Sequence, residues 1–183
     1  MAREKVYVGD EAGVQGRFQQ NIGQALSSVF GSCGYHFSFS DFKSSGHPYH
    51  RVPDSIIMSD EREIHVVGEL KAPWVAIHDL AELTKPSNMR LFRGVIGQIA
   101  RYMKDLNVAY GFLSTYNQTV FLKQQIVNGQ WVLFYSSVYQ DVPKDTATSL
   151  CVRKCFFFLG IKSSQAGPAH NSTPNILWSR RTE

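Results

Sequence analysis

Three side chains that could support metal-assisted chemistry, Asp54, Glu69 and Lys71, lie within one stretch, Val52–Trp74, of sequence VPDSIIMSDEREIHVVGELKAPW. A pair of carboxylates can hold a hard divalent cation, because the cation relieves the repulsion between two neighbouring negative charges. Mg²⁺ suits such a pair, with water and substrate phosphate completing its coordination, whereas no His or Cys spacing here indicates zinc. Beside the cation, the Lys71 amine could orient or help to deprotonate water, or neutralise charge on a phosphoryl group.

A β-hairpin would bring these side chains together. The apolar runs SIIM and IHVV lie on either side of a charged turn, which is typical of two antiparallel strands. We expect the turn to centre on Glu61 and Arg62, so that the numbers of paired residues sum to 123. Asp54 then faces Glu69, with Cβ atoms about 5 Å apart, and Lys71 lies on the same side of its strand as Glu69. A solvated hairpin with ordinary surface charges is the alternative, because a D…ExK pattern is short and common.

The composition indicates a single globular domain. The chain has 183 residues, of which 43% are hydrophobic and 19% are charged, as is ordinary for a soluble protein. Its formal net charge of +4 is compatible with binding to nucleic acid but does not establish it. No apolar run approaches the roughly 18 residues that span a membrane, and the N-terminus lacks the apolar core of a signal peptide. We therefore expect an intracellular protein, nuclear or cytoplasmic, without a membrane partner.

Neither the cysteines nor the histidines indicate a metal site. Cys33, Cys151 and Cys155 are an odd number without metal-binding spacing, and we expect Cys151 and Cys155, four apart on a helix, to be buried thiols. The six histidines show no zinc-binding spacing either, and we interpret them as structural or surface residues.

Hydrophobic periodicity predicts the order helix, strand, hairpin, helix, strands, helix. Asp10 is the expected N-cap of the first helix and Gly31 its stop signal. The pair Asn128-Gly129 is the strongest short hairpin signal in the chain. The expected elements are a helix over Asp10–Phe30, a strand over Tyr35–Phe42, the hairpin, a helical turn over Ile77–Leu83, a long helix over Asn88–Leu106, strands over Ala109–Thr115, Thr119–Ile126 and Trp131–Val138, and a last helix from Pro143.

Two of the expected helices present polar side chains at a spacing of four residues. Glu11 and Gln15 share one face of the first helix. An acidic residue such as Glu11 is also simply what the helix dipole favours in a first turn. Gln98 and Tyr102 project from one face of the long helix, where the polar edge of an amphipathic helix is the alternative to a functional pair.

These motifs resemble a known superfamily. The pattern VPD…GELK resembles the signature of the PD-(D/E)xK nucleases, and QIARY resembles the QxxxY motif of their RecB and lambda-exonuclease-like branch. The resemblance covers Asp10–Ile126. It implies an α/β (α+β) fold with the restriction-endonuclease-like αβββαβ core, a central mixed sheet flanked by helices, and an extra C-terminal hairpin and helix. We expect a nuclease-like domain over 1–162 and a flexible tail or linker over 163–183, which is rich in Ser, Gly, Pro, Asn and Thr.

The resemblance also assigns roles to residues. It implies that Asp54 and Glu69 are metal ligands together with the main-chain carbonyl of Leu70, and that Lys71 is the catalytic lysine. Many members of the superfamily also place a glutamate of the first helix near the metal.

Residues of the two helices complete the set. Gln98 and Tyr102 are expected to contact substrate phosphate or brace the lysine. The candidates for the position on the first helix are Glu11 and Gln15. If Gln15 occupies it, one charged ligand is missing, which puts a second metal or full activity in doubt.

The chemistry implied is hydrolysis of phosphodiester bonds with Mg²⁺, or Mn²⁺ as its substitute, and with nucleic acid, DNA in preference to RNA, as substrate. Trp74 could stack on a base or pack under the following loop, and Arg101 could contact the nucleic-acid backbone. Each basic side chain could equally be a solvated charge. The nearby basic residues are Lys43, Arg51, Lys85, Arg90, Arg93 and Arg101.

Two other hypotheses remain open. The nuclease fold could have become an interaction or effector module with weak or no activity, as a homo-oligomer or within a longer chain. The segment GQIARYMKDLNVAYGFLSTYNQTVFL further resembles uncharacterised fungal proteins in which such a domain lies beside a kinase-like domain. The charges could also be coincidental on a structural fold. An open cleft between Asp54 and Glu69 would favour the enzyme, and a filled site would favour the interaction module.

Overall fold

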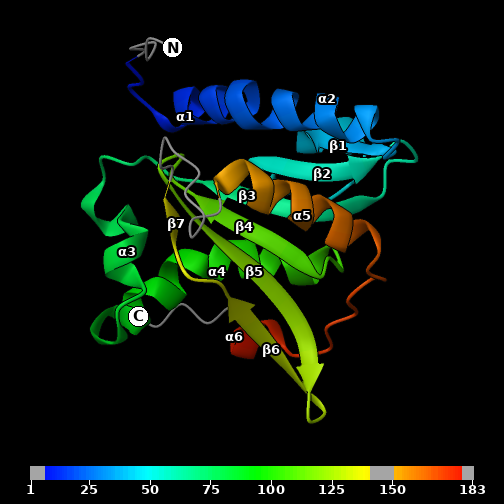
Figure 1. Cartoon of the computed structure of the whole chain (residues 1–183). Coiled ribbons are helices and arrows are strands. Elements are labelled where there is room, and N and C mark those ends of the chain that lie inside the picture. The colour runs from blue at the N-terminus through cyan, green and yellow to red at the C-terminus, as the bar shows by residue number, and fades with distance from the viewer. Residues whose placement is uncertain (1–6, 141–150, 179–183) are drawn as a thin grey trace.

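A seven-stranded sheet forms the centre of the computed structural model, which describes residues 7–140 and 151–178 (Figure 1). Its strands lie in the order β1-β2-β3-β4-β5-β6, and β7 pairs with the first two residues of β5. All neighbours are antiparallel except β3 and β4, which are parallel. The strands are β1 (Phe37–Ser40), β2 (Ser55–Ser59), β3 (Ile64–Leu70), β4 (Tyr110–Ser114), β5 (Gln118–Val127), β6 (Gln130–Tyr135) and β7 (Tyr139–Gln140).

Helices cover both faces of this sheet, which confirms the predicted mixed α and β class. One layer contains α1, α2 and α5, and the other contains α3 and α4 (Figure 1). None of the helices in the described part of the chain has the length and apolar character needed to cross a bilayer. The helices are α1 (Glu11–Phe18), α2 (Gln24–Ser32), α3 (Leu80–Leu83), α4 (Met89–Asp105), α5 (Val152–Ser164) and α6 (Asn175–Trp178).

The first helix is interrupted by one π-helical turn, Gln19–Gly23, which the sequence did not predict. Apolar residues recur every four positions, at Val14, Phe18, Ile22, Leu26 and Phe30, and all five are buried. In a regular α-helix of 3.6 residues per turn, residues four apart drift around the axis by about 40° at each step. The wider π-turn takes up part of this drift and keeps the row of apolar side chains on the sheet.

The two ends of this helix follow local signals. As predicted, Asp10 is the N-cap, and its Oδ1 accepts a hydrogen bond of 2.8 Å from the Gly13 N–H. The predicted stop at Gly31 is wrong, because the helix continues to Ser32. It ends instead before Gly34, whose φ of +77° lies in the left-handed region that glycine adopts easily.

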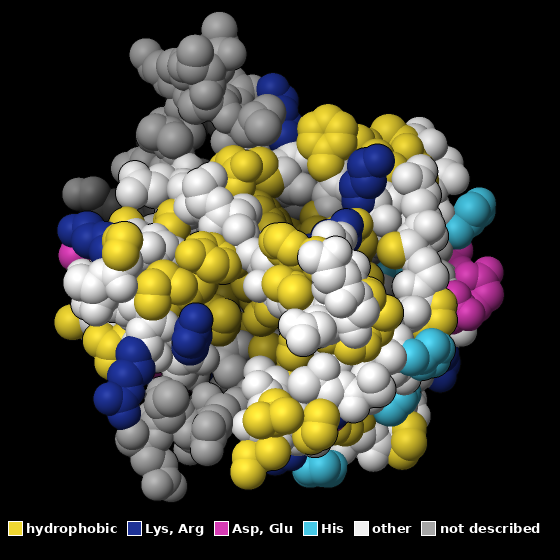
Figure 2. Space-filling model, turned by 90° about the horizontal axis from the view of Figure 1, so that it is seen from below, with side chains coloured by type: hydrophobic (Ala, Val, Ile, Leu, Met, Phe, Trp, Pro, Cys, Tyr) yellow, Lys and Arg dark blue, Asp and Glu magenta, His cyan; other side chains and the backbone are white. Residues whose placement is uncertain are grey.

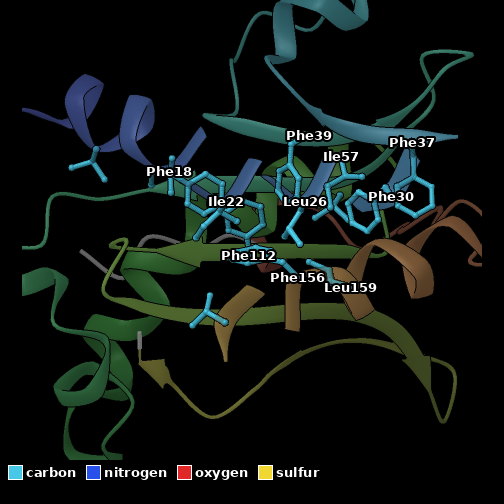
Figure 3. Close-up of a cluster of buried hydrophobic side chains, with 14 residues drawn as sticks. Phe18, Ile22, Leu26, Phe30, Phe37, Phe39, Ile57, Phe112, Phe156 and Leu159 are labelled. Atoms are coloured by element: carbon cyan, nitrogen blue, oxygen red, sulfur yellow. The ribbon is translucent and has the colours of Figure 1, made fainter. Parts of the chain in front are cut away.

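Aromatic rings fill the core between the sheet and the layer of α1, α2 and α5 (Figure 3). Phe112 of β4 stacks on Phe18 with ring centroids 5.3 Å apart and meets Phe156 of α5 edge-on at 4.8 Å. All three rings are fully buried, so they fix the position of α1 and α5 against β4.

A second core lies under α4 on the other face of the sheet. Phe92, Ile99 and Met103 are fully buried there. Leu91, an apolar residue of the same helix, is 51% exposed. The buried stripe of α4 is therefore narrow, and the opposite side of the helix faces solvent.

The pairing of β2 with β3 agrees with the predicted register next to the candidate site. Ser55 pairs with Gly68, so the residue numbers sum to 123. Asp54 directly precedes β2, and its N–H donates to the Gly68 carbonyl at 3.1 Å. Asp54 and Glu69 therefore lie on adjacent strands at the same end of the hairpin.

The predicted centre of this turn, at Glu61 and Arg62, is slightly wrong. Near the turn Met58 pairs with Ile64, so the numbers sum to 122. A β-bulge after Ile57 adds one residue to β3 and restores the register beyond it. The Asn128-Gly129 hairpin is confirmed, with positive φ at both turn residues.

The segment after Ser163 packs against the rest of the molecule, although its composition predicts a flexible tail. The Ala169 N–H donates to the Asn107 carbonyl at 2.7 Å, and the buried Asn171 donates to Gln124 Oε1 at 2.9 Å. These side-chain and backbone partners are distant in sequence, so composition could not indicate them.

Two further expectations concern the last helix and the thiols. The helix is described from Val152, and its predicted start at Pro143 lies outside the described residues. Cys151 and Cys155, which we expected to be buried, are half-buried, and Cys33 is exposed.

Candidate functional site

Asp54, Glu69 and Lys71 meet at one end of the β2–β3 hairpin. Val67 packs in the core under α4, and side chains alternate along a strand, so Glu69 and Lys71 point to this same face. The Lys71 Nζ donates a hydrogen bond of 2.7 Å to Glu69 Oε1. Glu69 is only 2% exposed, so a solvated surface charge does not describe it.

Two N–H groups hold the carboxylate of Asp54. The main-chain N–H of Leu70 donates to Asp54 Oδ2 at 2.7 Å, and Gln15 Nε2 donates to Asp54 Oδ1 at 2.6 Å. The side chain of Leu70 is buried in the core against α1 and α5, so its main chain alone faces the site. Backbone and side-chain donors therefore fix the orientation of Asp54.

Glu11 and Gln15, the two candidates on the first helix, both lie at the site, and each contacts a different residue. Gln15 contacts Asp54, as described above. Glu11 lies one turn earlier, and its Oε1 is 3.8 Å from Lys71 Nζ, with about half of the side chain exposed. Helix α1 thus adds one carboxylate beside the lysine and one amide beside Asp54.

One carboxylate oxygen in this group lacks a hydrogen-bond partner. Among the described residues, Glu69 Oε2 is buried and accepts no hydrogen bond. A buried acceptor without a donor is unfavourable by about 1–3 kcal/mol, and by more when it carries charge. This atom is therefore the strongest feature of the site that calls for an additional positive group.

The acids of the site have raised pKa values. Burial and the neighbouring charge of Asp54 raise the pKa of Glu69 from 4.5 to about 7, although its bond to Lys71 offsets part of the rise. Burial also raises the pKa of Asp54, against the effect of the Leu70 N–H and of Lys71. Burial alone would lower the pKa of Lys71, but the carboxylates of Glu69, Glu11 and Asp54 together raise it.

The raised pKa of Glu69 predicts a specific dependence of stability on pH. Between 4.5 and about 7 the unfolded chain loses the Glu69 proton while the folded chain keeps it, so unfolding becomes easier as pH rises. Without divalent cations, the wild type should lose about 3 kcal/mol of unfolding free energy relative to Glu69→Gln across this range. Urea denaturation of both proteins in EDTA, at pH 5 and pH 8, measures the difference. Parallel pH dependences would contradict it.

Gln98 and Tyr102 of α4 contact each other beside the hairpin. Gln98 Nε2 donates to the Tyr102 hydroxyl at 2.7 Å, and that hydroxyl donates to the Val52 carbonyl at 3.5 Å. The pair therefore braces the chain just before Asp54. Both side chains line the same cleft as Lys71.

This cleft has a volume of about 750 Å³ and runs over the surface of α4. One of its basic residues, Arg101 of α4, is partly paired, because its Nε lies 3.6 Å from Oδ2 of Asp105. The cleft is otherwise rich in positive groups, and no Asp or Glu is among the described residues that line it. The lining residues are Arg51, Val52, Lys71, His78, Arg93, Gly94, Val95, Gly97, Gln98, Arg101 and Tyr102.

Two glycines of α4, Gly94 and Gly97, form part of the wall of this cleft. A Cβ added at Gly94 or Gly97 would meet no described atom within 4 Å apart from the backbone of the helix itself. Neither glycine is therefore required by packing, yet each lowers helix stability by about 1 kcal/mol relative to alanine. Sequence reasoning missed them, although Arg93, Gly97 and Arg101 recur every four residues on one face of the helix.

A second cleft, of about 540 Å³, includes Asp54 in its lining. Its walls include Gln15 of α1, Lys43 and Asp54, and Val52 lines both clefts. Trp74 lines neither of these clefts and is 51% exposed, next to the exposed Val75 and Ile77. The structure therefore brings the hairpin, α1 and α4 together at the site, whereas Trp74 belongs to neither cleft.

Within residues 7–140 and 151–178, no cluster of three or more His, Cys, Asp or Glu side chains is arranged to hold a metal ion. No protein-family model matches the chain, and neither a curated protein sequence nor a solved structure matches it significantly. The function must therefore be inferred from the geometry and chemistry of the site.

Proposed function

We propose that the chain is a Mg²⁺-dependent nuclease of the restriction-endonuclease-like type that hydrolyses phosphodiester bonds in DNA or RNA. The observation that carries the proposal is the meeting of Asp54, Glu69 and Lys71 at one end of the β2–β3 hairpin, where Lys71 also lines an arginine-rich cleft. The order of elements also supports it, because α1–α2, β1, β2, β3, α4 and β4 follow the αβββαβ order of that core.

The residues of the site fit a hard divalent cation. Asp54 and Glu69 would hold it, with the main-chain carbonyl of Leu70 as a further oxygen ligand. The unpaired, buried Glu69 Oε2 supports this, because a cation would satisfy an oxygen that no described donor reaches. Mg²⁺ is commonly held by only one or two carboxylates together with water and substrate phosphate, so a cluster of three acids is not required. Mn²⁺ prefers the same oxygen ligands and would be its substitute.

The protein groups have separate roles in this mechanism. Bound Mg²⁺ would supply Lewis acidity at the phosphate and lower the pKa of a water nucleophile. Lys71 would carry positive charge beside the reacting phosphate, where it stabilises the extra negative charge of the transition state. Gln98 and Tyr102 would keep the segment before Asp54 in place through their contact with the Val52 carbonyl.

The cleft over α4 suits a polyanionic backbone. Arg51, Arg93 and Arg101 supply positive charge without sequence preference, as phosphate contacts do. Gly94 and Gly97 leave open space between the arginines, so a phosphodiester backbone could approach the helix closely. We expect the nucleic acid to lie along this wall and to enter the site at Lys71.

One observation favours an interaction module without activity as a second candidate. Both oxygens of Asp54 accept hydrogen bonds from N–H groups, and Gln15 stands where an acid would add a charged ligand. These bonds would compete with a cation for Asp54. The same cleft would then bind nucleic acid or another polyanion without cleaving it.

The first test is titration of the purified chain with Mg²⁺ and Mn²⁺ by calorimetry, together with a cleavage assay on single- and double-stranded DNA and on RNA. We expect cation binding and cation-dependent cleavage of at least one of these substrates. Cation-independent binding of oligonucleotide without cleavage would support the interaction module instead. Absence of both binding and cleavage would contradict both candidates.

The glycines of the cleft give a prediction that separates stability from function. Gly97→Leu should raise the unfolding free energy by up to about 1 kcal/mol, because leucine is a better helix former and its side chain enters open space. The same side chain should weaken oligonucleotide binding about tenfold by blocking the wall between the arginines. Chemical denaturation and fluorescence anisotropy with a labelled oligonucleotide measure the two effects.

Gly31→Leu is the matched control, because Gly31 is also helical, with open space around it, but lies outside the cleft. It should stabilise the helix without changing oligonucleotide affinity. Equal affinities of the wild type and Gly97→Leu would show that the glycine wall does not contact the ligand.

A further inference from the structure

The sheet has an open edge at β6. In the strand order β6 is the last strand, and no other described strand pairs with its outer side. The β5–β6 hairpin projects from the body of the molecule (Figure 1). The lower face in that view, toward which the hairpin extends, exposes many apolar side chains, interrupted by single Lys or Arg side chains (Figure 2).

The register of β5 with β6 shows which backbone groups are free. Val127 and Gln130 close the two-residue turn, and further along the strand the Ser136 N–H donates to the Phe121 carbonyl at 2.9 Å. In an antiparallel pair, successive residues direct their N–H and C=O groups alternately toward and away from the neighbouring strand. Even-numbered residues of β6 therefore bond to β5.

The odd-numbered residues of β6 direct their backbone groups to the open side. These are Trp131, Leu133 and Tyr135, and none of their N–H groups donates to a backbone carbonyl of another described residue. Three N–H and three C=O groups thus form a regular row with which an extended strand could pair.

The side chains of β6 do nothing to block such pairing. Its sequence, QWVLFY, contains no charged residue and no proline. Natural edge strands usually avoid pairing through charges, prolines, bulges or a covering element. Phe134 and Tyr135 are 43% and 44% exposed, so apolar surface accompanies the free backbone groups.

We propose that the chain forms a homodimer in which the β6 strands of two copies pair antiparallel across a twofold axis and join their sheets. A twofold axis brings a strand antiparallel to its own copy, so each free N–H meets a carbonyl of an identical strand. The absence of charge matters most for self-pairing, because identical charges would repel across the axis. This inference does not depend on the proposed nuclease activity.

One short strand from each copy makes a small interface, so the dimer should dissociate on dilution. Sedimentation velocity over a range of concentrations is the test, with wild type beside Phe134→Lys. We expect a monomer–dimer equilibrium for the wild type and dimerisation weakened about tenfold or more by the lysine, because charge on an edge strand opposes pairing.

Phe158→Lys is the matched control, because it makes the same change at a side chain that is 57% exposed on α5, away from the edge. It should dimerise as the wild type does. A wild type that stays monomeric at all concentrations, or a dimer that Phe134→Lys leaves unchanged, would overturn the proposal.

Amide hydrogen exchange measured by NMR distinguishes edge pairing from any other dimer. In dilute monomer the amides of Trp131, Leu133 and Tyr135 should exchange rapidly, while those of Val132 and Phe134 are protected by β5. In the dimer all five should be protected. A dimer in which the odd-numbered amides still exchange rapidly would place the interface elsewhere and contradict the inference.

Discussion

Replacing Glu69 by Gln is expected to abolish cation binding and to lower phosphodiester cleavage by roughly a thousandfold, because the metal contributes several kcal/mol to the transition state. Glutamine has nearly the same shape, so the cavity around Glu69 stays filled. It lacks the negative charge, however, and its NH₂ group cannot ligate a cation. Calorimetric titration with Mg²⁺ and single-turnover cleavage measure the two effects.

The folded state of this variant should be preserved. Above pH 7 Glu69→Gln no longer carries a buried carboxylate whose pKa is raised, so its unfolding free energy should equal or exceed that of the wild type. Loss of cleavage could then not be attributed to unfolding. Circular dichroism and urea denaturation at pH 8 provide this check.

Glu82→Gln is the matched control. Glu82 makes the same kind of pair with a lysine, because Lys85 Nζ lies 2.7 Å from its Oε1, but both side chains are 56% exposed. We expect this variant to bind Mg²⁺ and cleave as the wild type does. Cleavage that survives in Glu69→Gln would exclude the proposed site, even if the chain proves to be a nuclease.

Replacing Gly68 by Ala is expected to lower the unfolding free energy by about 3 kcal/mol, because the added methyl group has no space. Its Cβ would lie 2.0 Å from Cζ of Phe112 and within 2.6 Å of two further atoms of that ring. The ring cannot move aside easily, since it is fully buried between Phe18 and Phe156. Urea denaturation measures the loss.

Gly111→Ala tests whether the rigidity of Phe112 is the cause. A Cβ at Gly111 would lie 2.8 Å from Sδ of Met103, a flexible side chain that can shift, and its contact with the backbone oxygen of Val67, at 3.2 Å, is far less severe than the 2.0 Å contact at Gly68. The loss of stability should therefore be clearly smaller. In the double variant Gly68→Ala/Phe112→Leu, the smaller side chain should recover part of the loss caused by Gly68→Ala. Equal losses for the two glycines, or strict additivity in the double variant, would contradict this explanation.

Local patterns determined much of the arrangement around the candidate site. The predicted register of β2 and β3 holds near Asp54, because the bulge after Ile57 compensates for the one-residue error in the predicted position of the turn. Capping by Asp10 and the Asn128-Gly129 turn were also predicted, because both depend on contacts between residues close in sequence. The long helix α4 was predicted from the periodicity of its apolar residues, which is also a local pattern.

The surroundings of the carboxylates depended on contacts between residues distant in sequence. Sequence reasoning left Glu11 and Gln15 as alternatives, whereas the structure places one at Lys71 and the other at Asp54. The rotation of α1 that allows both follows from the π-turn and from the packing of Phe18 against the sheet.

The cleft and the C-terminal segment show the same limit. Arg51 precedes the hairpin, and Arg93 and Arg101 belong to α4, so only the packing of α4 on the sheet brings them together around one cleft. The segment after Ser163 packs on the rest of the molecule through hydrogen bonds between residues far apart in sequence, such as that of Asn171 with Gln124. Turns, caps and strand register arise from short-range geometry that one stretch of sequence contains. Burial, pKa and the grouping of charges arise from several segments at once, so only the tertiary structure decides them.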